Sequence, residues 1–454
     1  MAMATTRIRL LGQRMYRARR VASTFGRIYL QIKANQFMAR HTDEFEMRLR
    51  WARFNRRSAE SIFEAAVELR GLILKACQFV GSRTDVLPPE YCEVLSQLQD
   101  RVPPRPFSEI RTVVERELGM PLDQAFSDFS ERSVASASLA QVHQAHLPDG
   151  RRVAVKVQYP EIPELVRSDL SNLNALFQAV GLVERNFDLI PLIDELTEHL
   201  PRELDFCNEA RNSERVAKFF ENRDDLFIPA IHWELTTTRL LVSEFVDGIK
   251  INDTRGLEAA GISCAAVMQS LIEAYCEQIL VHGFFHADPH PGNLMVLPPT
   301  AEDEPPTVVF LDFGLAKRLP PAFRQSAVEF AAALLQGNSR AMGSALIDLG
   351  FETREDSPEA LQLIAEILLN AAKRLRNQAH LDPDVIREAG ENLARVIREN
   401  PIIRIPSHIV LLGRVFGLLS GVGNTLGVQL DMLQTILPYA AGVSPSSSTE
   451  KGGA

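Results

Sequence analysis

The sequence predicts an α+β protein in which a β-rich region lies between longer helical segments. Apolar residues within residues 58–120 recur at spacings of three and four, which is typical of amphipathic helices. From Ser133 the apolar period changes to two, which indicates strands, and after Asp312 the pattern is almost wholly helical. At 454 residues the chain is long enough for two or three domains.

The composition restricts the class of protein. Its hydrophobic share of 46% and charged share of 24% are those of a soluble globular protein, and a net charge of −9 argues against a nucleic-acid partner. The five cysteines have no C-x-x-C spacing and are odd in number, which predicts a reducing compartment without disulfide partners. The most apolar stretch, residues 409–430, contains Arg414 and several glycines, so we expect buried helices there rather than a membrane span.

Residues 1–57 form a basic amphipathic segment. Nine Lys or Arg and no acidic residue occur within residues 1–42, interspersed with apolar side chains. This pattern is typical of helices that lie on anionic membranes and also of mitochondrial presequences. A plain solvated helix is the remaining alternative.

Residues 58–81 are predicted to form a helix with Ser58 as its N-cap and Gly81 at its end. Its apolar residues make one continuous stripe. Lys75 and Gln78 are three residues apart and lie off this stripe, so they share another face of the helix.

Two shorter helices are expected next, at residues 88–99 and 108–119, and they complete a helical extension over residues 58–125. A Pro-Pro pair begins the first of them, and Ser108 is the expected cap of the second.

A β-hairpin is predicted at the start of a second region, which spans residues 126–246. Strand patterns at 141–147 and 151–157 flank the turn sequence P-D-G. The second strand reads VAVKVQ, which matches the V-A-I-K strand whose lysine contacts the α- and β-phosphates of ATP. Lys156 is therefore a candidate catalytic and nucleotide-binding residue, and a solvated strand lysine is the alternative.

The loop before these strands stands where kinases place a glycine-rich phosphate clamp, yet it contains no glycine. Its backbone N–H groups can still contact phosphate, although without the φ > 0 conformations that glycine allows. The candidate nucleotide-binding residues of this loop are Ala135, Ser136, Ala137 and Ser138. A simple tight turn is the alternative.

A helical stretch predicted from residue 163 to about residue 220 supplies acidic residues. A phosphate-binding lysine must be oriented by a helix-borne carboxylate, so an acid from this stretch, which contains Glu203, Asp205 and Glu209, is required beside Lys156. Asp205 lies one turn from Glu209 if the helix is continuous, whereas Glu203 points elsewhere.

A second hairpin is predicted from strands at 231–235 and 239–245. It leads into a hinge whose backbone, at Glu244 and Val246, is a candidate for binding adenine. A helix over residues 265–281 comes next.

The strongest signal lies in residues 282–314, within a third region over residues 247–440. Asp288 and Asn293 match H-x-D-x-x-x-x-N, whose Asp accepts the proton of a substrate hydroxyl, and Asp312 begins a D-F-G motif. Asn293 and Asp312 supply the hard oxygen ligands that Mg²⁺ prefers. The two motifs, in this order and with a predicted hairpin between them, predict a phosphotransferase that uses ATP and Mg²⁺.

A zinc site is the competing interpretation, because His282, His286 and His290 stand four residues apart. A glycine and two prolines interrupt any helix that would align them, so a transition-metal site is not expected.

The chain resembles the UbiB/AarF/ADCK family of atypical kinases over roughly residues 58–440, which leaves a predicted disordered tail at 441–454. The resemblance rests on LKACQ, LPPEY, LQDRVPPRPF, VASASLAQVH, VAVKVQYP, ELDFCNEA, FFHADPHPGN and LDFG. It implies a two-lobed, protein-kinase-like fold with a helix-rich C-terminal lobe. It also implies an N-terminal helical extension that covers the site where peptides would bind.

The resemblance also implies residue roles. By motif, it implies that Lys156 pairs with Glu209 and contacts the phosphates. It also implies that Asp288 has the catalytic-loop role and that Asn293 and Asp312 bind metal. The regulatory residues are Lys75 and Gln78 of a K-x-G-Q motif and Glu203 and Asp205 of an E-x-D motif, and we expect Lys75 to pair with one of these acids. Two departures from the family pattern are Cys77, in place of glycine, and Ser136, which interrupts an alanine run.

The expected function is an ATP-binding atypical kinase or ATPase at a membrane surface, supporting isoprenoid-quinone (ubiquinone) biosynthesis or related lipid metabolism. One alternative is a nucleotide-gated lipid-binding or scaffold protein without phosphotransfer. Another is a small-molecule kinase, because His290 replaces the lysine that protein kinases carry two residues after the catalytic Asp. The expected partners besides ATP are an anionic membrane and a quinone-like or lipid molecule. The expected location is cytoplasmic or on the cytoplasmic face of a bacterial membrane, with the mitochondrial matrix side as the alternative.

Overall fold

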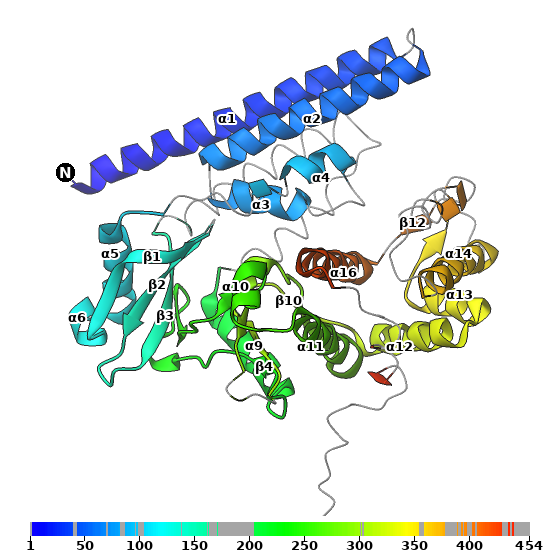
Figure 1. The fold of residues 1–454 in the computed structure, drawn as a ribbon. Coiled ribbons are helices and arrows are strands. Elements are labelled where there is room, and N and C mark those ends of the chain that lie inside the picture. Colours follow the sequence, from blue (N-terminus) through cyan, green and yellow to red (C-terminus); the bar gives the residue numbers. More distant parts are fainter. Residues whose placement is uncertain are drawn as a thin grey trace, which may run out of the picture. The chain divides into compact units, whose positions relative to one another are not determined.

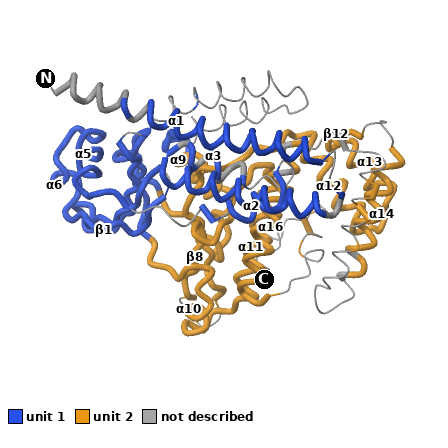
Figure 2. Tube along the Cα trace, turned by 90° about the horizontal axis from the view of Figure 1, so that it is seen from above, with its two compact units in different colours: residues 1–208, 231–245 blue, residues 209–230, 246–454 orange. Residues whose placement is uncertain are grey.

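In the computed structural model, the chain folds into two compact units (Figure 2). One unit comprises residues 1–208 and 231–245, and the other comprises residues 209–230 and 246–454. The structure describes residues 2–39, 43–69, 71–81, 87–95, 97–98, 104–137, 139–160, 162, 170, 204–299, 301, 304–353, 358–376, 388, 392–393, 395–396, 402–404, 406–428, 435 and 438–439. Ser138, Glu203, most of the predicted helix before residue 204 and the tail at 441–454 therefore lie outside the described residues.

The first unit begins with helices α1 (Ala2–Met38), α2 (Glu44–Leu69), α3 (Gly71–Gly81) and α4 (Pro89–Leu95). The long helices α1 and α2 lie side by side (Figure 1). Val21 of α1, Ala66 of α2 and Leu74 of α3 belong to one hydrophobic core, and Arg20 forms an ion pair with Glu68 at 2.8 Å.

The predicted start of a helix at Ser58 is wrong, because α2 begins at Glu44 and runs through Ser58 without interruption. Met47 and Phe54 are buried, and this packing extends the helix beyond the cap-like residue. The chain then turns at Gly71, whose φ of 58° separates α2 from α3. The predicted domain boundary between residues 57 and 58 thus falls inside a helix.

The same unit contains an antiparallel sheet of four strands in the order β1-β2-β3-β5. The strands are β1 (Asp128–Ser136), β2 (Ala140–His146), β3 (Arg152–Gln158) and β5 (Leu240–Glu244). The predicted β2–β3 hairpin is confirmed. Val155 and Val157 are fully buried in a core shared with helices α5 (Phe107–Leu118) and α6 (Leu122–Ala125). Because side chains alternate along a strand, Lys156 lies on the opposite face of the sheet.

Two local predictions around this sheet are wrong. Helix α5 begins at Phe107 after Pro106, so Ser108 is not its cap, although Gly119 ends the helix in the left-handed conformation. Residues 231–235 do not form a strand. Ile231 makes a single bridge to Ser243, and Trp233–Leu235 is a short 3-10 helix, η2.

The second unit begins within helix α9 (Phe206–Phe219), and its other helices pack around a large core. These helices are α10 (Thr254–Ala259), α11 (Cys264–Cys276), α12 (Pro321–Gln336), α13 (Ser339–Asp348), α14 (Pro358–Arg376) and α16 (Ser407–Leu426). Two short helical segments are also present, a π-helix η3 (Glu277–His282) and a 3-10 helix η4 (Pro291–Asn293). The helix-rich character predicted for the region after Asp312 is confirmed.

The strands of this unit form three small sheets within the described residues. One has the order β4-β9-β8-β6, and the others pair β10 with β7 and β11 with β12. The strands are β4 (Leu226–Phe227), β6 (Ile249–Lys250), β7 (Phe284–His286), β8 (Leu294–Leu297), β9 (Thr307–Phe310), β10 (Ala316–Arg318), β11 (Glu352–Thr353) and β12 (Ile402–Arg404). The β8–β9 hairpin and the β7–β10 pair carry the segment with the two acidic motifs.

Candidate active site

The first acidic motif is delivered by α11 and its π-helical continuation, which ends at Gly283 with φ 59°. Strand β7 follows, and its last residue, His286, is fully buried. The His286 backbone N–H donates to Gln278 Oε1 at 2.9 Å. The loop after β7, which carries Asp288 and is the candidate catalytic loop, is therefore connected by a hydrogen bond to the helical segment that precedes it.

The His286 imidazole connects the first motif to the second. Its Nε2 is bonded to the carbonyl oxygen of Asp312, so this nitrogen must be the donor. Its Nδ1 then accepts from the Tyr275 hydroxyl at 2.9 Å. Burial lowers the pKa of His286 and raises the pKa of Tyr275, so both groups are held neutral. His286 is thus a positioning residue rather than a proton carrier.

Asp288 lies at the start of the loop after β7, and its backbone and side chain have different partners. Its carbonyl oxygen accepts from Asn293 Nδ2 at 3.1 Å and from the His290 N–H at 2.7 Å. Its carboxylate Oδ1 accepts from Arg414 of α16 at 2.7 Å. The loop therefore places the carboxylate beside a guanidinium.

The β8–β9 hairpin brings Asn293 and Asp312 together. Leu294 pairs with Phe310 in the hairpin, and the Leu311 N–H donates to the Asn293 carbonyl at 3.0 Å. Asn293 stands immediately before β8 and Asp312 comes after β9, so both occupy the same end of the hairpin.

These two residues suit a hard cation. The amide nitrogen of Asn293 is used by Asp288, so its oxygen is the atom that would ligate a metal. Asp312 Oδ1 accepts from the Gly314 N–H at 2.9 Å, which orients the carboxylate. Amide and carboxylate oxygens are the ligands that Mg²⁺ prefers. The donor set is therefore compatible with magnesium.

Glu209 lies beside the D-F-G motif in the same unit. A Cβ added to Gly314 would stand 3.1 Å from Asp312 Oδ1 and 3.6 Å from Glu209 Oε2, so the two carboxylates flank one glycine. Asn212 of α9 also donates from Nδ2 to the Phe313 carbonyl at 3.2 Å. Helix α9 thus carries its buried acid to the start of the second motif.

Lys156 belongs to the other unit, so its predicted pairing with Glu209 stays a prediction. Within its own unit, Lys156 Nζ lies 5.2 Å from the centroid of the Phe206 ring. Phe206 is the first residue of α9. The Asp205 carboxylate accepts from the Cys207 N–H at 3.0 Å, and Asp205 immediately precedes α9, so the helix that carries Glu209 does not continue back through Asp205.

The glycine-free loop is the end of a strand followed by a turn. Ala135 and Ser136 pair with β2, and the Ala137 N–H donates to the Ala140 carbonyl at 2.8 Å. The Ser136 hydroxyl is 2.9 Å from the Tyr159 hydroxyl. Part of the donor set expected to contact phosphate is therefore engaged within the turn.

The remaining predicted site residues lie at the boundary between the two units and on α3. Glu244 ends β5, and the chain enters the second unit between Phe245 and Val246. Lys75 and Gln78 lie on α3, and their side chains are outside the described part of the structure. Their role in the K-x-G-Q motif stays a prediction.

The three histidines of the alternative zinc interpretation have separate partners. His282 stacks on Phe219 with ring centroids 3.9 Å apart, His286 is buried between Tyr275 and Asp312, and His290 Nδ1 accepts from the Gly292 N–H at 3.1 Å. Among the residues that the structure describes, no group of three or more His, Cys, Asp or Glu side chains could hold a metal ion.

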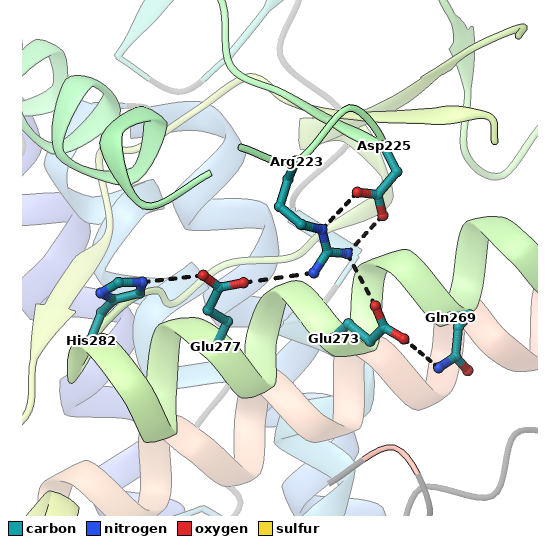
Figure 3. A network of polar contacts seen from close by, with 6 residues as sticks. All are labelled: Arg223, Asp225, Gln269, Glu273, Glu277 and His282. Carbon is teal, nitrogen blue, oxygen red and sulfur yellow. Dashed lines mark hydrogen bonds and ion pairs between the residues drawn. The ribbon is translucent and has the colours of Figure 1, made fainter. Parts of the chain in front are cut away.

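A largely buried ion network contacts α11 (Figure 3). Arg223 donates to Asp225 through two bonds of 2.7 Å and to Glu273 at 3.1 Å, and its Nη1 lies 3.6 Å from Glu277. Glu277 also contacts His282 Nε2 at 3.3 Å. The network joins the segment after α9 to α11 and to the π-helix before the catalytic loop.

Comparison with known proteins identifies the fold and the family of the chain. The fold matches the solved structure of an Rv3197–erythromycin complex from Mycobacterium tuberculosis with a TM-score of 0.61 and 23% identity, over 85% of this chain and 96% of that one. The model of the ABC1 atypical kinase-like domain matches residues 97–346. The fold is thus α+β and protein-kinase-like, as the sequence predicts.

Two relatives extend the match along the chain. It is 33% identical over 392 residues to AarF domain-containing protein kinase 1 of Xenopus tropicalis, covering 85% of this chain and 73% of that protein. It is 32% identical over 412 residues to Protein ACTIVITY OF BC1 COMPLEX KINASE 8, chloroplastic, of Arabidopsis thaliana, covering 84% of this chain and 53% of the relative. The chain belongs to the UbiB/AarF/ADCK family of ABC1 atypical kinase-like proteins.

Sequence reasoning missed Arg414 and Arg223. Arg414 stands out in the sequence only as a charge inside an apolar stretch, and that isolated charge is the available signal, since a buried arginine requires a partner. Arg223 belongs to no motif, and two of its three acidic partners, Glu273 and Glu277, lie about 50 residues away in the sequence.

Proposed function

We propose that this chain is an ATP-dependent atypical kinase or ATPase. The observation that carries the proposal is the placement of Asp288, Asn293 and Asp312 at the ends of neighbouring strands of one unit. His286 and the Asn293 amide hold them there. Family membership and the donor chemistry of these residues support the same conclusion.

Each residue has a chemical task in phosphoryl transfer. Asp288 would accept the proton of the attacking hydroxyl or water, and Lys156 would bind the α- and β-phosphates with Glu209 as its expected counter-ion. Asn293 and Asp312 would hold Mg²⁺, which supplies charge neutralisation at the phosphates. The hydrogen bonds of the loop keep the Asp288 backbone fixed, as an orientation-dependent reaction requires.

The turnover of radiolabelled ATP tests this proposal. Wild-type protein and Asp288→Asn are compared with Mg²⁺, with and without anionic liposomes and a quinone-like phenol. We expect turnover in the wild type and a loss of about 10²-fold or more in the variant, since a positioned acid–base group contributes about that factor. Mg²⁺-dependent ATP binding without turnover would indicate the nucleotide-gated scaffold instead, and phosphorylation of the phenol would identify a small-molecule kinase.

We also propose that the site works at an anionic membrane, for isoprenoid-quinone or related lipid metabolism, with α1 as the docking helix. Val21 and Ile28 of α1 are buried, while Leu30 and Phe37 are 69% and 65% exposed. At 100° per residue the exposed apolar residues lie on the side of the helix opposite the buried ones, together with basic residues such as Arg19. Exposed apolar residues among basic ones suit the surface of an anionic bilayer.

Among the described residues, no helix combines the length and apolar character that crossing a bilayer requires. The proposed location is the cytoplasm or the cytoplasmic face of a bacterial membrane, and the matrix side of a mitochondrial membrane is the second possibility.

A further inference from the structure

Arg414 is separated from Asp288 by 126 residues, yet their side chains meet at 2.7 Å. Arg414 lies on α16 between Gly413, which is exposed, and Val415, which is fully buried. The side chain of Arg414 is only 14% exposed. Removing the Arg414 guanidinium from water is unfavourable, and a well-formed ion pair is needed to offset this desolvation.

Helix α16 is held against α11, so the position of Arg414 is set by packing. A Cβ added to Gly423 of α16 would stand 3.6 Å from the Met268 methyl of α11, so the two helices are in close contact there. The buried Leu419 and Val422 of α16 belong to the same hydrophobic core as Leu271 of α11. Because α11 also leads into the catalytic loop, one packed unit determines both partners of the ion pair.

The catalytic loop itself lacks a cation at the place where protein kinases carry one. His290 stands two residues after Asp288, and its Nδ1 accepts from the Gly292 N–H at 3.1 Å. The imidazole of His290 is thus engaged in capping its own turn. Asp288 therefore meets positive charge from α16.

We infer that Arg414 is a further active-site residue, which contacts the transferring phosphoryl group and holds the Asp288 carboxylate in place. The inference rests on the proposed phosphotransfer. In that reaction the acceptor oxygen forms a bond to the γ-phosphorus and its proton passes to Asp288. The bond between the γ-phosphorus and the β–γ bridging oxygen breaks, and its electron pair stays on ADP.

A cation at this position would reduce the electrostatic repulsion between Asp288 and the phosphoryl group. An unpaired Asp288 carboxylate would repel the anionic phosphoryl group that must approach it. A guanidinium presents five N–H donors in a planar fork, so one arginine can bind a carboxylate and a phosphate oxygen at once. Arg414 thus replaces, from a distant helix, the lysine missing from the loop.

Three variants of Arg414 test the assignment by MgATP turnover and MgATP affinity. We expect Arg414→Gln to lower kcat by about 10²–10³-fold, the usual effect of losing one donor to a transition-state oxyanion. Its MgATP affinity should change by less than about threefold, since the interaction is made mainly in the transition state. Arg414→Lys should retain more activity than the glutamine variant. Added guanidinium ion should restore part of the turnover of Arg414→Ala, an effect that a purely structural residue would not show.

The matched control is Arg374→Gln, which breaks an exposed Arg–Glu pair of 2.6 Å in the same unit and should leave turnover unchanged. A glutamine variant of Arg414 with wild-type or higher turnover would overturn the role of Arg414, and so would the absence of guanidinium rescue in a folded Arg414→Ala. Undetectable turnover in the wild type, with MgATP bound, would instead refute the proposed function itself and this inference with it.

Discussion

Replacing Arg223 by methionine should destabilise the second unit strongly, because it removes the cation shared by three acidic side chains. The Arg223 side chain is 13% exposed and contacts Asp225, Glu273 and Glu277 at 2.7, 3.1 and 3.6 Å. Removing one partner of a buried ion pair costs about 3–5 kcal/mol, since the remaining charges stay desolvated. For a unit of this size, that corresponds to a fall in Tm of about 6–20 °C.

The stability difference between wild type and Arg223→Met should depend on pH in a defined direction. Burial acts to raise the pKa of Asp225, but its bonds to Arg223 outweigh burial and the net pKa is lowered. In the wild type this contribution to stability is present above the unfolded pKa of about 3.9 and is lost as the pH falls through the folded value. Without Arg223, burial would raise the pKa of the Asp225 carboxylate. The variant therefore becomes more stable relative to the wild type as Asp225 is protonated. The difference between the two proteins should therefore shrink from pH 7 to pH 4.

Urea unfolding followed by circular dichroism at pH 7, 5.5 and 4 measures this difference. Arg374→Gln again serves as the control, because an exposed pair contributes only about 0–1 kcal/mol. A free energy of unfolding for Arg223→Met within about 1 kcal/mol of the wild type at pH 7 would refute the reasoning. A difference that widens on acidification would refute it as well.

Four further outcomes are expected. Asp312→Asn should lose Mg²⁺-dependent nucleotide binding in equilibrium titrations, because one hard anionic ligand is removed; unchanged binding would exclude Asp312 as a ligand. Arg19→Glu with Arg27→Glu should weaken low-salt sedimentation with anionic liposomes by at least about 30-fold, at about 1 kcal/mol per basic residue, and equal sedimentation would leave α1 without a membrane role. Lys75→Ala should change ATP turnover if Lys75 pairs with an acid of the E-x-D motif, and unaltered turnover and autophosphorylation would contradict the occluded-site mechanism. Because burial lowers the pKa of His286, the free energy of unfolding should fall as the pH drops below the unfolded value of about 6.5, and His286→Asn should lack this component.

Local patterns were enough to predict the elements that build the site. The alternation in VAVKVQ predicted β3 and the face of Lys156, because side chains in any strand alternate between the two sides of the sheet. The H-x-D and D-F-G motifs predicted the β8–β9 hairpin with Asn293 and Asp312 at the same end of it, because the residues concerned are close in sequence. The wrong helix start at Ser58 lies where tertiary packing overrides a short-range signal, because Met47 and Phe54 are buried on the same helix. At residues 231–235 the chain forms a single bridge and a 3-10 helix instead of the predicted strand.

Only the tertiary structure showed which distant charges meet. Arg414 reaches Asp288 because α16 packs on α11, and no periodicity or spacing carries information about a contact across 126 residues. The same holds for the contacts of Arg223 with Glu273 of α11 and Glu277 of the π-helix, whereas Asp225 is only two residues away. A charged residue within an apolar stretch indicates that it has a partner, because burying a charge without one is too costly. Which residue is that partner depends on how the whole unit is packed.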